Sequence, residues 1–132
     1  MKKILYLLLI SITIFSLTGC GNNINKKIAG TWTYEWKTIY GTKCEEKYIF
    51  KEKGTGTFSF YNYANLDSFS VDDFRYEVKD DIITVISVDP TGDAKKEKIL
   101  TYIQLKEESN GIVLIDLCND NSCNHELQKD DN

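Results

Sequence analysis

The fold is decided by the stretch TWTYEWKTIY at residues 31–40, in which large aromatic side chains alternate with polar ones. Successive side chains of a β-strand point to opposite faces, so a period of two indicates a strand that is buried on one face. The aromatic face carries Trp32, Tyr34, Trp36 and Tyr40, and the polar face carries Thr33, Glu35 and Lys37.

The same alternation recurs along most of the rest of the chain, although residues 55–63 carry aromatic side chains on both faces and residues 82–88 are apolar on both faces. These patterns predict seven further strands, over residues 44–51, 55–63, 73–79, 82–88, 98–106, 112–118 and 123–129. No window of ten or more residues in this region carries a convincing helical stripe. Consecutive strands with short links predict an all-β fold, a small eight-stranded antiparallel up-and-down barrel, because closure removes the exposed sheet edges. Such a barrel holds its own side chains or one small ligand.

The rings on the inward faces have two interpretations. Burial of each large ring contributes roughly 1.5–3 kcal/mol, so a short chain rich in rings predicts a filled core. The alternative is a ligand cavity, for which we retain a shallow pocket at the barrel mouth near Trp36 and Tyr40. The rings concerned are Trp32, Tyr34, Trp36, Tyr48, Phe50, Phe74 and Tyr76.

The first 19 residues have the character of an export signal. Lys2 and Lys3 precede an apolar stretch at residues 4–17, which is shorter than the roughly 20 residues that cross a bilayer. The stretch ends in Leu17-Thr18-Gly19-Cys20, which resembles the lipobox of bacterial lipoproteins. The resemblance implies that the Cys20 thiol receives diacylglycerol and that the chain is cleaved in front of this residue.

These features divide the chain into a cleaved signal peptide (1–19), a lipidated cysteine with a short tether (20–27) and a barrel domain (28–132). In a meander, the loops that join odd to even strands lie at one rim and the other loops lie at the opposite rim. The first set is longer and would form the open mouth, while the chain enters at the opposite rim. We therefore expect the mouth to point away from the membrane. The longer loops are residues 41–43, 64–72, 89–97 and 119–122.

Two short motifs resemble lipocalin-like domains. Residues 27–32 (KIAGTW) look like the Gly-x-Trp opening of their first strand, and residues 53–57 (KGTGT) look like the turn after the second strand. The resemblance implies a lipocalin-like barrel domain over residues 28–132, in which Gly30 and Trp32 plug the closed end and which binds a small apolar ligand. The late Arg that packs on this Trp in lipocalins has no counterpart, because the only Arg is Arg75.

Three cysteines besides the lipidated one are predicted at the mouth rim. Exported proteins meet oxidising surroundings, and two of the cysteines flank a four-residue polar turn. We predict a Cys118–Cys123 disulfide, because residues opposite each other in a hairpin lie near disulfide range, with Cys44 free. The alternative is a zinc site of all three with His125. Their spacing is not a strong zinc motif, so we predict no metal and a solvated His125.

The sequence contains no phosphate-binding loop, no His-Glu-x-x-His and no Gly-x-Ser-x-Gly motif. We therefore expect neither an enzyme nor a bound cofactor. The formal net charge is −4, and it becomes more negative when Lys2 and Lys3 leave with the signal peptide. An acidic domain is repelled by nucleic acid, so we expect no nucleic-acid partner.

The expected function is that of a monomeric extracytoplasmic lipoprotein that binds a small apolar ligand at the barrel mouth. Its lipid would anchor it to the cell membrane or outer membrane. Two alternatives remain open. One is a protein-binding envelope lipoprotein, such as an inhibitor of a cell-wall-degrading enzyme, and the other is a structural envelope protein without a ligand. A basic partner would suit acidic residues in the predicted loops, which are Asp67, Asp72, Asp89, Asp93 and Asp120.

Overall fold

The computed structural model describes residues 20–64, 67–118 and 124–131, so the predicted signal peptide lies outside the described residues. A short helix and a 3-10 turn accompany eight strands. In chain order the elements are α2 (Cys20–Ile28), β1 (Gly30–Lys37), β2 (Lys43–Phe50), β3 (Thr55–Asn62), β4 (Asp67–Lys79), β5 (Ile82–Ser87), η1 (Ala94–Lys96), β6 (Ile99–Glu108), β7 (Gly111–Asp116) and β8 (His125–Lys129).

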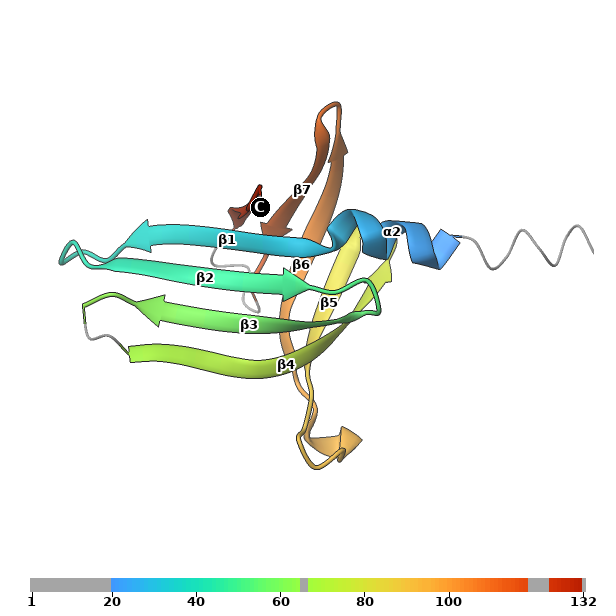
Figure 1. Cartoon of the computed structure of the whole chain (residues 1–132), viewed down its shortest axis with the longest axis horizontal. Coiled ribbons are helices and arrows are strands. Elements are labelled where there is room, and N and C mark those ends of the chain that lie inside the picture. Colours follow the sequence, from blue (N-terminus) through green and yellow to red (C-terminus); the bar gives the residue numbers. More distant parts are fainter. Residues whose placement is uncertain (1–19, 65–66, 119–123, 132) are drawn as a thin grey trace, which may run out of the picture.

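The strands form a closed antiparallel barrel in sequence order, β1 to β8 (Figure 1). The barrel closes where β8 pairs with β1, with Trp32 opposite Lys129 and Thr33 opposite Gln128. This confirms the predicted all-β up-and-down architecture. The regular alternation of apolar and polar residues specifies the register, because a slip of one residue would turn each apolar face to solvent.

One end of the barrel is filled by large apolar side chains. The ring centroids of Phe50 and Phe74 lie 5.3 Å apart, and those of Phe50 and Tyr76 lie 5.1 Å apart. Gly56 makes this packing feasible, because a Cβ there would lie 2.3 Å from the Ile49 carbonyl oxygen and 2.4 Å from the Phe74 ring. The largest fully buried side chains are Trp32, Phe50, Phe74, Ile28, Ile83, Ile103, Leu114, Leu127 and Val85.

Helix α2, which was not predicted, covers the residues 20–27 that we expected to form a short polar tether. Ile24 and Ile28 are one helical turn apart and pack on the barrel core, where Ile28 is fully buried. The segment carries only these two apolar anchors besides its cysteine, too few for a helical stripe to be visible in the sequence. No helix among the described residues has the length and apolar character to cross a membrane.

Three predicted strand bounds were wrong in ways that matter for the mouth. β1 ends at Lys37, and Tyr40 lies in a tight turn that Gly41 completes with a φ of +79°. The β-forming character of Ile39 and Tyr40 had extended the predicted strand through this turn. β4 begins at residue 67, so most of the predicted 64–72 loop is strand, and β8 begins at residue 125 instead of 123.

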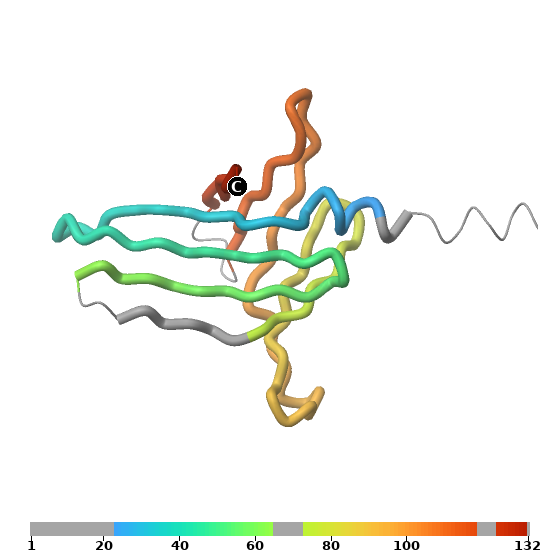
Figure 2. The backbone as a smooth tube through the Cα atoms, in the orientation of Figure 1, coloured from blue at the N-terminus to red at the C-terminus, as the bar shows by residue number. Residues whose placement is uncertain are grey.

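The two rims differ as the meander predicts. Helix α2 lies at the rim of the short turns, where Asn25 Nδ2 donates to the Glu52 carbonyl oxygen at 3.2 Å and Lys27 pairs with Glu107 at 2.7 Å. Figure 2 shows the β1–β2 turn at the opposite end from α2. The chain thus enters the barrel away from the mouth.

Candidate functional site

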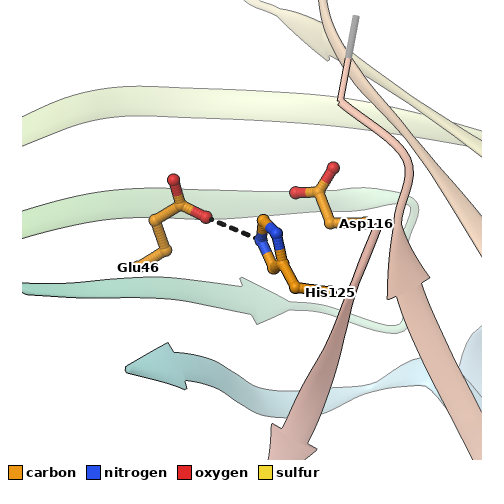
Figure 3. Close-up of side chains that lie close together, drawn as sticks. All are labelled: Glu46, Asp116 and His125. Carbon is orange, nitrogen blue, oxygen red and sulfur yellow. Dashed lines mark hydrogen bonds and ion pairs between the residues drawn. The ribbon is translucent and has the colours of Figure 1, made fainter. Parts of the chain in front are cut away.

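Three ionisable side chains meet inside the mouth half of the barrel: Glu46 of β2, Asp116 of β7 and His125 of β8 (Figure 3). Strand alternation explains why they point inward. Glu46 precedes the core residue Tyr48 by two positions, and His125 stands two positions before the core residue Leu127. Asp116 and His125 face each other directly in the β7–β8 register.

Asp116 is a buried carboxylate held by three hydrogen-bond donors. The Tyr48 hydroxyl donates to Oδ2 at 2.6 Å, the Thr101 hydroxyl donates to Oδ1 at 2.6 Å, and the Cys118 backbone N–H donates to Oδ1 at 2.9 Å. The residue is only 2% exposed, so it needs these donors in place of water. Burial and the Asp116 charge raise the pKa of the Tyr48 hydroxyl, which therefore remains a donor.

His125 is enclosed, and our expectation of a solvated side chain was wrong. Its side chain is 12% exposed, its ring stacks on Tyr34 with centroids 3.9 Å apart, and its Nε2 lies 3.2 Å from Glu46 Oε2. Burial raises the pKa of Glu46, and the nearby Asp116 charge adds to this effect while His125 opposes it. The site therefore concentrates negative charge in a poorly hydrated place.

A cavity of about 220 Å³ adjoins the cluster inside the mouth. Its wall combines aromatic and aliphatic side chains with the two carboxylates. The lining residues are Glu46, Tyr48, Phe58, Leu100, Thr101, Asp116 and Cys118.

The predicted pocket of Trp36 and Tyr40 does not form. Trp36 packs against Tyr34 and Phe60, with ring centroids at 5.5 and 5.7 Å, and borders an outer recess of about 370 Å³ shared with Glu35, Lys37 and Lys43. Tyr40 is 88% exposed at the tip of the β1–β2 turn. The two residues are therefore separated by the end of the strand.

The residues expected to plug the barrel lie at its closed end. Trp32 is fully buried and donates from Nε1 to the Ile28 carbonyl oxygen at 2.8 Å. Gly30 is the first residue of β1 and lies against the Lys129 side chain. The Lys129 ammonium lies 5.3 Å from the centroid of a Trp32 ring, within the range of a cation–π interaction.

The two cysteines whose side chains the structure describes agree with the prediction. Cys44 is a free, buried thiol, and Cys118 is disulfide-bonded. The predicted partner, Cys123, lies outside the described residues, and so does the side chain of the lipidation candidate Cys20. The alternative zinc set is not assembled, because Cys118 is oxidised and His125 instead meets Glu46 and Asp116.

The cluster brings together groups that bind cations. One imidazole nitrogen and one oxygen from each carboxylate lie within 4.8 Å of one another, an arrangement suited to a metal ion. Sequence reasoning missed Glu46 and Asp116, although a signal existed, since each is acidic yet in phase with inward-facing apolar neighbours. Comparisons with protein families, curated proteins and solved structures found no match for this chain.

Proposed function

We propose that this protein is a monomeric extracytoplasmic lipoprotein, anchored through lipid on Cys20, whose barrel binds a small ligand in its mouth. The observation that supports binding is the division of the interior into two halves. The closed end is filled by rings such as Phe50 and Phe74, whereas the mouth half keeps a cavity of about 220 Å³ beside buried polar groups.

The cavity suggests the class of ligand. Pockets for drug-sized molecules are typically about 300–1,000 Å³, so this cavity suits a smaller molecule. Phe58 and Leu100 offer apolar contact, while Glu46 and Asp116 accept hydrogen bonds. We propose a small ligand with an apolar body and one cationic or hydrogen-bond-donating end.

The lipid anchor is compatible with access to the mouth. Helix α2 follows directly from the proposed lipidation site and packs at the short-turn rim, opposite the mouth. A lipid at its start would leave the mouth facing away from the cell membrane or outer membrane. The acidic charge argues against nucleic acid as a partner, and the proposal assigns the site a binding role and no reaction.

Native mass spectrometry of the protein purified under metal-free conditions tests the binding proposal. A bound small-molecule mass is expected, and Leu100→Trp should eliminate it by filling the cavity. The matched control is Ile99→Trp, because Ile99 precedes Leu100 on β6 and is exposed. An unliganded mass after gentle purification and screening, or binding that survives Leu100→Trp, would contradict small-ligand binding in this cavity.

Metabolic labelling with palmitate tests the anchor in cells that express the full chain. Label and membrane association are expected for the wild type and should be lost in Cys20→Ser. Cys44→Ser is the control, because Cys44 is a buried thiol inside the barrel. Label that persists in Cys20→Ser would exclude lipidation of Cys20.

A second candidate, a protein-binding lipoprotein, is favoured by Ile39 and Tyr40, which are 93% and 88% exposed at the β1–β2 turn. Of the acidic residues that suggested a basic partner, Asp67 and Asp72 lie on β4 and not in a loop, and Asp120 lies outside the described residues. Salt-sensitive inhibition of a purified basic lysozyme, lost on serine substitution of the two apolar turn residues, would support this candidate.

A further inference from the structure

We propose that Glu46, Asp116 and His125 form a binding site for a divalent transition metal ion, for which Zn²⁺ is the test ion. The site lies beside the mouth cavity but does not depend on the small-ligand proposal. It uses two carboxylate oxygens and one imidazole nitrogen, delivered by three different strands (Figure 3).

The distances are close to those that a metal ion needs. Zinc lies about 2.0–2.2 Å from nitrogen and oxygen ligands, so two ligand atoms on one ion are roughly 3–3.6 Å apart. His125 Nε2 and Glu46 Oε2 are already 3.2 Å apart, and all three donor atoms lie within 4.8 Å of one another. A modest side-chain movement completes the geometry. Glu46 has the most freedom to move, because its side chain is less buried than those of its two partners.

The charge of the cluster favours a cation. Two carboxylates face a single imidazole, which carries at most one positive charge. Among the described residues, the lysines near these strands pair elsewhere, since Lys47 binds Glu45 at 3.1 Å and Lys43 binds Glu35 at 2.7 Å. Buried carboxylates without balancing positive charge are costly, and a divalent ion in the site removes that imbalance.

The surroundings orient the ligands as they do in metal sites, where outer hydrogen bonds fix the ligands that touch the ion. Donors from Tyr48, Thr101 and Cys118 hold the Asp116 carboxylate, and stacking on Tyr34 holds the His125 ring. The nitrogen ligand favours zinc and its neighbours over calcium and magnesium, which prefer oxygen alone. Three protein ligands would leave a coordination position for water or for a molecule in the cavity.

The only histidine of the chain makes the test direct. Full-length protein is expressed and purified without a histidine tag, stripped with a chelator, and titrated with Zn²⁺ by calorimetry and by ¹⁵N NMR of the imidazole. We expect one ion per chain and a shift of the single imidazole signal. Glu46→Gln and His125→Gln should each weaken binding by about tenfold or more. Glu126→Gln, an exposed neighbour on β8, should bind as the wild type does.

Binding that is absent at millimolar Zn²⁺, or that survives both ligand substitutions, would overturn the metal site. An organic ammonium ion that shifts the imidazole signal where Zn²⁺ does not would assign the charge imbalance to a cationic ligand and also overturn it. Glu46→Gln preserves the size of the side chain and a hydrogen bond to His125, so we expect the variant to fold. A thermal melt without metal checks this. Failure here leaves the small-ligand proposal intact, because that proposal is tested in metal-free protein.

Discussion

Replacement of Tyr48 by Phe removes one hydroxyl from the interior and nothing else. That hydroxyl donates at 2.6 Å to the carboxylate of Asp116, which is buried and accepts two further hydrogen bonds. A hydrogen bond to a charged group contributes about 1.5–3 kcal/mol, so we expect the free energy of unfolding to fall by about 2 kcal/mol. For a domain of this size, that loss corresponds to a decrease in melting temperature of roughly 8 °C.

Tyr76→Phe is the matched control, because it makes the same chemical change at the other end of the barrel. The Tyr76 hydroxyl donates at 2.7 Å to the neutral carbonyl oxygen of Lys51, where a hydrogen bond contributes only about 1 kcal/mol. Urea unfolding followed by tryptophan fluorescence measures both variants. If Tyr48→Phe costs no more than Tyr76→Phe, the hydrogen bond from Tyr48 to the buried Asp116 side chain does not stabilise the barrel as we infer.

Three further predictions concern the barrel itself. Gly56→Ala should lower the free energy of unfolding by about 1–3 kcal/mol, because its Cβ would overlap the Phe74 ring. Adding Phe74→Leu should offset part of that loss in a double-mutant cycle monitored by urea unfolding, and strictly additive costs would contradict the overlap. Ile28→Ala should cost about 2–5 kcal/mol by calorimetry, since Ile28 is fully buried where α2 meets the barrel, and a neutral effect would mean that α2 does not dock. Peptide mapping without reduction should recover a Cys118–Cys123 cross-link, and a cross-link of Cys118 to another cysteine would refute the predicted pairing.

The barrel could be predicted from sequence because the pattern that indicates a strand recurs many times along the chain. Most strands alternate apolar and polar residues, as the Trp32–Trp36 stretch does, and each such repeat independently specifies a strand and its buried face. Errors fell where local propensity and tertiary context disagree. Ile39 and Tyr40 favour strand locally, yet the chain turns at Gly41. Helix α2 depends on packing against the barrel, which a local pattern of two apolar residues cannot reveal.

The candidate site was harder to predict than the fold. Glu46, Asp116 and His125 come from positions up to 79 residues apart, and only closure of the barrel brings β8 and β2 to either side of β1. The inward phase of Glu46 beside Tyr48 was readable from the alternation. What the sequence could not supply was the stagger between strands, which decides whether inward residues lie at the same height in the barrel.

The most direct test of the central claim, that the barrel mouth holds a polar site for a cation, is a crystal structure of the protein grown with Zn²⁺. Anomalous scattering measured on both sides of the zinc edge locates the ion without reference to any assumed geometry. We expect one strong peak between Glu46, Asp116 and His125, with ligand distances of about 2.0–2.2 Å. A mouth without a peak, in crystals saturated with zinc that show zinc only on surface carboxylates, would contradict it.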